Sequence, residues 1–336
     1  MSHGIAFLVY LWFLSVGWAG LPLLPPEVCF PRVISEGDKG SVPLLPWRWM
    51  TWNLQWFPGH HPQSSSEAQS QHIQSVSLLL GKRWPQVAVL QEVLNPGALQ
   101  RATPGYPWRA MTDFQRAGDE EEKLPPQNIA LISQWPWSEV WVIDFHRLPL
   151  APDRPVRGFL GALFQDDQGR KITVYGVHLK SNRGGREGSA KRRVKAIDYL
   201  RWDWERRGLD PERDAILLGG DFNCSTRNPE FTEDTIRALV GGGWALADRE
   251  LGWPEGATVK PDPAGRFPAA DFDHFLLSPG WLKVLGGEKP QVRILSGENI
   301  PSDHYPVELI LRANFNPPAK HPVMKRGSDR RGTEPP

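Results

Sequence analysis

Two short stretches in the second half of the chain hold the side chains best suited to chemistry. The stretch 217–223, LLGGDFN, is typical of a buried strand that ends at a glycine pair and then presents Asp221 and Asn223 on one side. Further on, the carboxylate of Asp303 stands directly beside the imidazole of His304. A carboxylate to activate water, an amide to orient it and a His–Asp pair to stabilise negative charge are suited to phosphoester hydrolysis.

Other polar side chains also stand where apolar, strand-like stretches begin or end. They are Asn53, Glu92, His178 and Asp273. A single Asn or Glu at such a place is more often a turn or capping residue, and a single His is more often structural. The recurrence of the pattern, rather than any one member, carries the inference of a shared site.

Strands and helices, which must position these residues, follow one another along the chain. Strands are expected at 48–52, 87–90, 129–133, 140–143, 158–164, 172–179, 215–218, 272–277, 292–295 and 307–311, and helices at 71–83, 186–207 and 233–240. The helix at 186–207 should bury Val194, Ile197, Leu200 and Trp204. Hairpin and crossover connections together favour a mixed α/β layered fold over a uniformly parallel sheet.

Composition sets broad limits. The 336 residues are 40% hydrophobic and 23% charged, enough for a substantial core, and the formal net charge of +1 gives no global reason to expect nucleic acid or membrane as a partner. Residues 21–46 hold six prolines and are predicted to be a linker, residues 47–313 one domain, and residues 314–336 a disordered basic tail.

The N-terminus resembles an export signal. Residues 5–16 are apolar, and Gly17 and Ala19 suit cleavage after Ala19, so residues 1–20 are predicted to be a signal peptide of a secreted or periplasmic protein. No Lys or Arg precedes the apolar run, and an uncleaved membrane anchor reaching Leu24 is the alternative. The two cysteines, Cys29 and Cys224, are expected to be separate thiols, with a disulfide between them as the alternative.

Six pieces of the sequence resemble, in order, the motifs of the endonuclease/exonuclease/phosphatase superfamily, which includes DNase I, apurinic endonucleases, neutral sphingomyelinases and inositol-polyphosphate 5-phosphatases. They are TWN at 51–53, LQEV at 90–93, GVHLKS at 176–181, GGDFN at 219–223, FDHF at 272–275 and SDHYPV at 302–307. The resemblance implies a four-layer α/β sandwich, with two mixed β-sheets packed face to face and helices outside.

The same resemblance implies a divalent metal and its ligands. Glu92 is similar to the family's main Mg²⁺ ligand, with Asn53 and Asp303 close by, and Mn²⁺ is a possible substitute. Mg²⁺ prefers hard oxygen ligands, binds through few carboxylates and keeps several waters, which this set permits.

The remaining matches imply catalytic roles. Asp221 would orient or deprotonate the attacking water and Asn223 would hold it in line, whereas His178 would donate to a phosphate oxygen. His304 would stabilise the transition state, with Asp273 fixing its tautomer and favouring the protonated ring.

Two further residues are candidates for phosphate binding. Asn128 resembles the Asn that precedes a central strand in the family, with a structural role in satisfying backbone groups as the alternative. Arg157 opens the strand at 158–164 and could clamp phosphate, with a solvated surface arginine as the alternative.

The substrate is less defined because this fold hosts many phosphoesterases. Nine Lys and Arg stand against four acidic residues between 183 and 207, and Arg183, Arg186, Lys191, Arg192 and Arg193 could follow a polyanionic backbone; a solvated helix face is the alternative. A nuclease is therefore the first hypothesis, without a stable protein partner. A phospholipid or sphingomyelin phosphodiesterase or a phosphatase is the alternative, and a non-catalytic binding module is a third. Trp135, Trp137 and Trp253 could imitate a membrane-contacting hairpin, although buried turn aromatics are the simpler interpretation.

Overall fold

The computed structural model describes residues 26–38, 46–114, 125–146, 148, 153–166, 169–247, 251–265, 267–297 and 299–312. The predicted signal segment at 1–20 and the predicted tail at 314–336 lie outside the described residues. Among the helices that are described, none has the length and apolar character needed to cross a bilayer.

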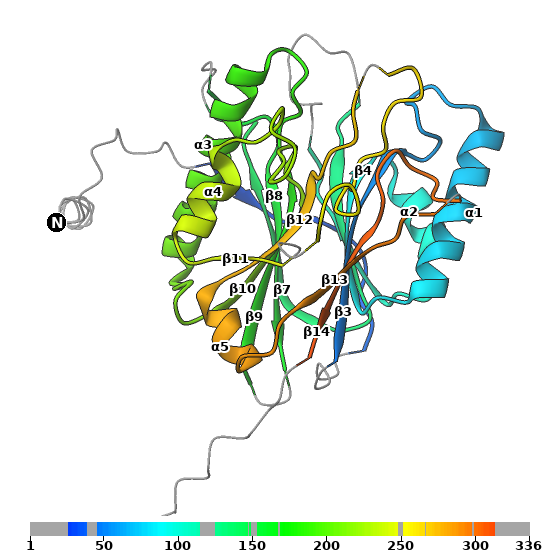
Figure 1. Ribbon diagram of the computed structural model, residues 1–336. Coiled ribbons are helices and arrows are strands. Elements are labelled where there is room, and N and C mark those ends of the chain that lie inside the picture. The colour runs from blue at the N-terminus through cyan, green and yellow to red at the C-terminus, as the bar shows by residue number, and fades with distance from the viewer. Residues whose placement is uncertain are drawn as a thin grey trace, which may run out of the picture.

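Two seven-stranded sheets of mixed direction form the centre of the molecule (Figure 1). The first sheet has the order β1 (Glu27–Cys29), β7 (Trp137–Asp144), β8 (Phe159–Gln165), β9 (Lys171–His178), β10 (Ala215–Asp221), β12 (Asp273–Leu277), β11 (Ala245–Leu246). The second has the order β13 (Gln291–Ile294), β14 (Val307–Leu311), β3 (Trp47–Phe57), β4 (Val87–Val93), β6 (Asn128–Ser133), β5 (Trp108–Met111), β2 (Arg32–Ser35).

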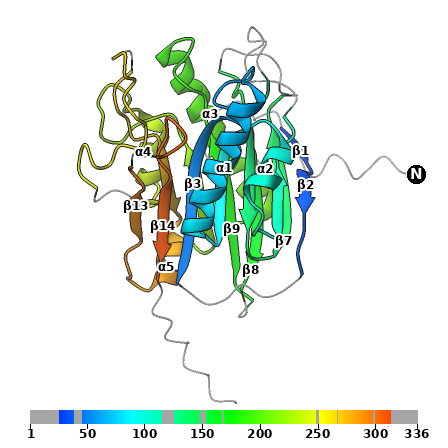
Figure 2. The same ribbon diagram turned by 90° about the vertical axis from the view of Figure 1, so that its right-hand side faces the viewer.

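Helices cover the outer faces of both sheets (Figures 1 and 2). Helices α3 (Arg186–Arg207) and α4 (Asp234–Gly241) pack on the first sheet, and α1 (Ser66–Arg83) and α2 (Pro96–Ala102) pack on the second. The short α5 (Pro279–Leu285) follows β12 and inserts Trp281 and Leu285 between the sheets. The predicted four-layer sandwich is therefore confirmed.

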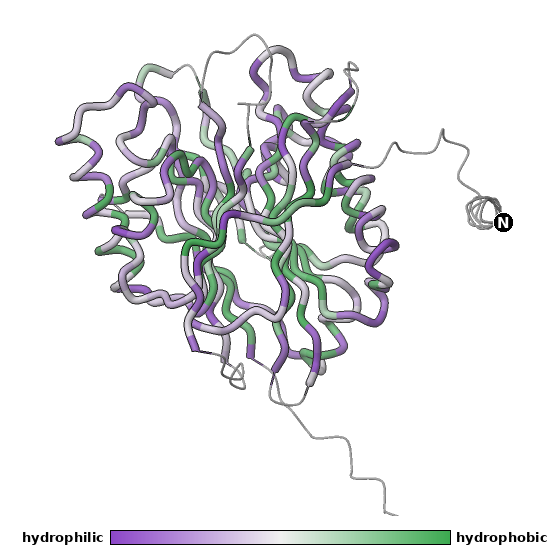
Figure 3. The backbone as a smooth tube through the Cα atoms, turned by 180° about the vertical axis from the view of Figure 1, so that it is seen from behind, coloured by the Kyte–Doolittle hydropathy of each residue, from purple (hydrophilic) through white to green (hydrophobic). Residues whose placement is uncertain are grey.

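The hydrophobic core has one layer between the sheets and one under each helical layer, and hydrophobic residues follow the central strands in Figure 3. The indole rings of Trp47, Trp49, Trp135 and Trp281 pack against one another between the sheets. Trp135 is 6% exposed, so it is a core residue and not part of a membrane-contacting hairpin.

Helix α3 has the bounds that its sequence predicts, because Gly208 caps it in the left-handed conformation. Its inward face includes Ile197, Leu200 and Trp204, as expected, but Val194 is 36% exposed, contrary to the prediction. Within the described residues, no disulfide joins Cys29 to Cys224.

The predicted linker at 21–46 is wrong over part of its length. Residues 27–29 form β1, which pairs antiparallel with β7 at the edge of the first sheet. A few residues later β2 pairs antiparallel with β5 at the edge of the second sheet. We call this strap, residues 26–35, the N-terminal arm. Proline-rich sequence favours extended backbone, and edge strands tolerate proline because one side of the strand needs no partner.

Candidate active site

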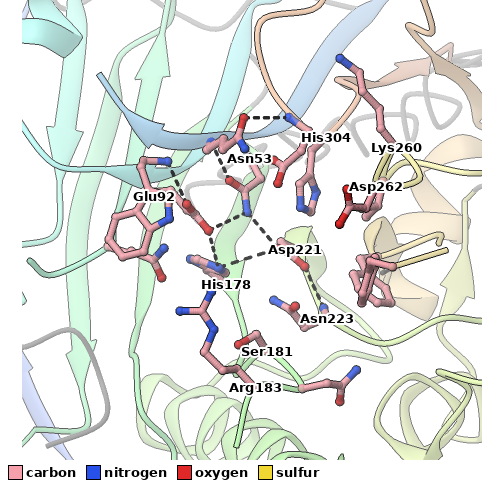
Figure 4. Close-up of a pocket in the computed structure, with 18 of the residues that line it drawn as sticks. Asn53, Glu92, His178, Ser181, Arg183, Asp221, Asn223, Lys260, Asp262 and His304 are labelled. Carbon is pink, nitrogen blue, oxygen red and sulfur yellow. Dashed lines mark hydrogen bonds and ion pairs between the residues drawn. The ribbon is translucent and has the colours of Figure 1, made fainter. Parts of the chain in front are cut away.

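Four strands from the two sheets deliver their ends to one cleft of about 900 Å³ (Figure 4). The parallel pair β3 and β4 supplies residues from the second sheet, and the parallel pair β9 and β10 supplies them from the first. Parallel neighbours end on the same edge of their sheet, so polar residues that follow the apolar runs gather there. Asn53, Glu92, His178, Asp221, Asn223, Asp303 and His304 all line this cleft.

Two glycines allow the strands to approach closely enough to form the floor of the cleft, where Asn53, Glu92, His178 and Asp221 lie. A Cβ on Gly220, whose φ is +157°, would lie 1.9 Å from the carbonyl oxygen of Val177 in β9. A Cβ on Gly176 would lie 2.9 Å from side chains of the opposite sheet. The register then sets His178, Asp221 and Asp273 side by side across β9, β10 and β12.

Irregular backbone aims Asn53 and Glu92 into the cleft. The ladder between β3 and β4 shifts register after Asn53, and the ladder between β4 and β6 shifts after Leu90. Glu92 has a φ of +60°, which costs a non-glycine residue about 1–3 kcal/mol and persists only where the surroundings enforce it. Bulges of this kind re-aim side chains beside active sites.

Asn53 lies between the partly buried carboxylate of Glu92 and the buried carboxylate of Asp221. Its Nδ2 is 3.3 Å from Oε1 of Glu92 and 3.0 Å from Oδ2 of Asp221, and its Oδ1 accepts from the backbone N–H of Gln55. Glu92 also accepts from the backbone N–H of Trp56 at 2.9 Å. Burial, together with the charge of Asp303, raises the pKa of Glu92 above its ordinary value.

Asp221 has the protonation behaviour of a general base. Burial and the neighbouring charge of Asp273 raise the pKa of Asp221 to about 7. Its Oδ1 accepts from the backbone N–H of Asn223 at 2.8 Å, and the Nδ2 of Asn223 donates to the carbonyl of Leu179 at 3.1 Å. A base whose pKa lies near neutral pH serves proton transfer best.

His304 is held as a cation. Burial alone would lower its pKa, but the carboxylate of Asp273, 2.7 Å from Nδ1, and the charges of Asp221 and Asp303 outweigh burial, so the pKa rises well above 6.5. Ser302 fixes the loop, since its Oγ donates to the Asn53 carbonyl and accepts from the N–H of His304.

His178 is the opposite case. Burial and the charges of Arg157 and His304 lower its pKa well below 6.5, so the ring is neutral. Its Nε2 lies 3.8 Å from Oε1 of Glu92 and 3.7 Å from Oδ2 of Asp221, as Figure 4 shows. A neutral imidazole can still donate one hydrogen bond, as the predicted role requires.

The residues fit a divalent cation. Glu92, Asn53 and Asp303 offer oxygen ligands at the cleft. Burial and the charge of Asp303 raise the pKa of Glu92, and a bound cation would offset both effects. A second set of possible ligand atoms, from Asp221, Asp273 and His304, lies within 4.8 Å of one another. In this second set Asp273 is already hydrogen-bonded to His304, whereas the oxygen set has no such internal ion pair among the contacts of the described residues.

The two phosphate-binding candidates differ. Arg157 lines the cleft, where its guanidinium donates to the Leu179 carbonyl and to Gln127. Asn128 does not belong to the cleft lining, and the prediction that it binds phosphate is wrong. Its Oδ1 accepts from Thr112 Oγ1 and from the N–H of Phe114, so it stabilises a turn, the alternative given by its sequence.

Most of the basic residues predicted to follow a polyanionic backbone, at 183–193, lie outside the cleft. Of these five residues, Arg183 alone lines the cleft. Arg186 donates to the Thr232 carbonyl, Lys191 pairs with Glu187, and Arg193 is 1% exposed. Lys260, His60 and His61 also line the cleft, from the loops at 58–61 and 259–263, and were not predicted from the sequence. Nothing in their local sequence marked them, apart from the adjacent histidine pair.

Comparisons with known proteins identify the family and the fold. The family model described as "Endonuclease/Exonuclease/phosphatase family" matches residues 50–304, whereas no curated protein sequence matches the chain. Sphingomyelinase C from Streptomyces griseocarneus has a similar structure, with a TM-score of 0.59 and 17% identity over 80% of this chain and 100% of that chain.

Two more solved structures share the fold. Truncated Caenorhabditis elegans TDP2 superposes with a TM-score of 0.54 and 16% identity, covering 80% of this chain and 98% of that chain. A mannosyl-6-phosphatase from Bacteroides thetaiotaomicron gives a TM-score of 0.54 and 15% identity, covering 78% and 98%. With the match spanning every proposed catalytic residue, the chain belongs to the endonuclease/exonuclease/phosphatase family and is a hydrolase of phosphoester bonds.

Proposed function

We propose that the protein is a divalent-metal-dependent phosphodiesterase that cleaves short, single-stranded nucleic acid. The charge of the cleft supports this substrate. Apart from the side chains assigned to metal and catalysis, His304 among them, the lining has four cationic side chains against one acidic side chain, Asp262. The four cations are Arg157, Lys180, Arg183 and Lys260.

This surplus of positive charge favours a substrate with more than one phosphate. Cationic side chains bind phosphate oxygens and give affinity for a polyanion. A choline head group is itself a cation and would gain nothing from them. Because the other basic residues predicted between 183 and 193 do not line the cleft, the contact is limited to the cleft, which favours a short strand over a long duplex.

The residues of the chain then divide the reaction between them. Asp221 removes the proton of the attacking water, and Asn223 orients that water toward phosphorus. As the new P–O bond forms, the bond to the leaving oxygen breaks, and that oxygen takes a proton from bulk water. The protonated ring of His304 stabilises the charge that develops on the phosphate oxygens, while neutral His178 donates to a non-bridging oxygen. Glu92, Asn53 and Asp303 would hold Mg²⁺, or Mn²⁺ in its place, which supplies Lewis-acid polarisation of the phosphate.

We also propose that the protein is exported, on the basis of the apolar segment at 5–16 and the small residues Gly17 and Ala19. An extracellular or periplasmic enzyme would meet single-stranded fragments of released nucleic acid. Retention of the segment as an anchor would place the same cleft near a membrane.

A substrate panel tests the proposal. Purified protein is assayed with single-stranded DNA, RNA, plasmid DNA, sphingomyelin and a sugar phosphomonoester, each with Mg²⁺ and with chelator. We expect metal-dependent cleavage of the single strands, slower cleavage of plasmid, and loss of activity with chelator. Cleavage confined to sphingomyelin or to the phosphomonoester would overturn the nuclease assignment.

A further inference from the structure

The loop at 180–183 forms one wall of the cleft. Lys180, Ser181, Asn182 and Arg183 all line it, directly after β9 has delivered His178 to the floor. The loop continues into Gly184 and Gly185, whose φ values of +87° and +114° suit glycine, and then into α3. A glycine-rich loop of this kind needs external contacts to hold one conformation.

Those contacts come from Arg193, a buried arginine in the second turn of α3. Its Nη1 donates to the carbonyl of Lys180, and its Nη2 donates to Oδ1 of Asn182 at 2.9 Å. The same guanidinium forms a bidentate pair with Glu233, the residue before α4. The side chain of Arg193 is 1% exposed and that of Glu233 is 8% exposed.

The floor of the cleft is fixed by different contacts. The N–H of Leu179 donates to the Asp221 carbonyl at 2.9 Å, and the Leu179 carbonyl accepts from both Asn223 and Arg157. Arg193 does not take part in these contacts at Leu179; it donates to the carbonyl of the next residue, Lys180. The reacting groups and the wall are therefore supported separately.

We propose that Arg193 is a positioning residue that fixes the 180–183 wall for binding the part of the substrate that flanks the scissile phosphate. This inference rests on the proposed nuclease function. Arginine suits the task because its planar fork serves the carboxylate of Glu233 and two loop acceptors at once, which the single ammonium of lysine does not. The wall contributes affinity for an extended substrate, whereas the chemistry at phosphorus depends on the floor.

The test compares an extended and a minimal substrate. The Arg193→Lys variant keeps the charge opposite Glu233 and loses the fork. For a thymidine tetranucleotide we expect KM to rise about tenfold, on the scale of one to two hydrogen bonds, with kcat within about twofold of wild type. For bis(p-nitrophenyl) phosphate, which has no second phosphate, kcat/KM should change less than about twofold.

Matched variants separate positioning from folding. Arg201→Lys makes the same exchange on α3 at a residue paired with Asp198, and should leave both substrates unaffected. Glu233→Gln keeps the Arg193 contacts to the loop and should lower the melting temperature while leaving KM within about twofold of wild type. A purely structural role would instead make Glu233→Gln raise KM as much as Arg193→Lys does.

A binding measurement gives a readout without turnover. In an Asp221→Asn background, fluorescence anisotropy of a labelled tetranucleotide should show Kd rising about tenfold on Arg193→Lys. Unchanged KM and Kd, or equal losses on both substrates, would overturn the inference. Failure of the proposed function is distinct: the unmodified protein would then neither cleave nor bind the tetranucleotide, whatever its rate on bis(p-nitrophenyl) phosphate, and the inference would fall with it.

Discussion

Nδ1 of His304 lies 2.7 Å from Oδ2 of Asp273, and the pair joins the two sheets. Asp273 opens β12 in the first sheet, whereas His304 precedes β14 in the second. The imidazole is 10% exposed and the carboxylate is fully buried. A hydrogen-bonded ion pair in such a place holds its charges in a fixed geometry, because the carboxylate of Asp273 is shielded from water and has the imidazole as its partner.

Asp273→Asn should make activity more sensitive to alkaline pH. The charge of Asp273 helps to raise the pKa of His304, so its removal lowers that pKa and leaves less of the cation at high pH. We expect a loss in kcat of about 10²-fold at pH 8 and a smaller loss at pH 6. Rates measured across this range test the prediction, and a loss independent of pH would contradict it. Asp234→Asn, on the exposed face of α4, is the control.

Asp221→Asn should reduce kcat by about 10²-fold or more, since it removes the base and keeps the shape. The wild-type rate should rise with pH as the carboxylate, whose pKa is about 7, loses its proton. Circular dichroism is expected to match that of wild type. Retained turnover on every phosphoester would show that another group takes the proton.

Glu92→Gln should weaken metal binding without unfolding the protein. Burial and the charge of Asp303 raise the pKa of Glu92. At a pH above the ordinary pKa of a glutamate, the ionised side chain therefore destabilises the metal-free fold, and Gln removes that cost. We expect the metal-free variant to melt at or above the wild-type temperature. Saturating Mg²⁺, at roughly 100 times Kd, should stabilise wild type by about 2.7 kcal/mol and the variant much less. Calorimetry with and without Mg²⁺ checks both parts.

His72 should make the protein sensitive to acid. Burial and the charge of His60, whose ring stacks on it, lower the pKa of His72 to about 3, and the Nδ1 of His72 accepts from the N–H of Gly59. The unfolded chain therefore binds more protons between about pH 3 and the ordinary pKa of 6.5, and stability falls as pH drops through this window. One such group contributes up to about 1.4 kcal/mol per pH unit.

Urea unfolding at pH 5 and pH 7 tests the His72 prediction. His72→Gln should show a smaller difference between the two free energies of unfolding than wild type does. The more exposed His61, changed to Gln, is the control. An unchanged difference in His72→Gln would mean that other groups set the acid response.

Two glycine substitutions should change the free energy of unfolding in opposite directions. Gly220→Ala places a Cβ 1.9 Å from the Val177 carbonyl oxygen and should destabilise by about 3 kcal/mol or more, because backbone must move. Gly188→Ala, in α3 with no atom within 4 Å of the new Cβ, should stabilise by about 0.5–1 kcal/mol. Thermal unfolding of the two variants measures this contrast, and equal effects would contradict it.

The sequence was sufficient to predict the residues on the floor of the cleft, because their placement depends on short-range patterns. Asn53, Glu92 and Asp221 each follow a run of apolar residues, and buried strands that end in polar residues place them at a sheet edge. The resemblance to the family added that these edges meet. Only the structure gives the bulges that turn Asn53 and Glu92 toward one another.

The walls of the cleft could not be predicted in the same way. Whether Arg193 faces solvent or the interior depends on Glu233, forty residues further along, and the sequence does not show that contact. Lys260 reaches the cleft because Val259 bridges to both Ala270 and His304, which is a tertiary contact. Long-range pairings of this kind leave no periodic signal in the local sequence.

The N-terminal arm supplies an edge strand to each of the two sheets. If the chain were trimmed to residue 47, where the proline-rich composition ends, β5 and β7 would each expose an unpaired row of backbone donors and acceptors. Such rows template strand addition between molecules, so the shortened protein should aggregate even with every catalytic group in place. Its solubility thus depends on a segment that, judged by composition, looks dispensable.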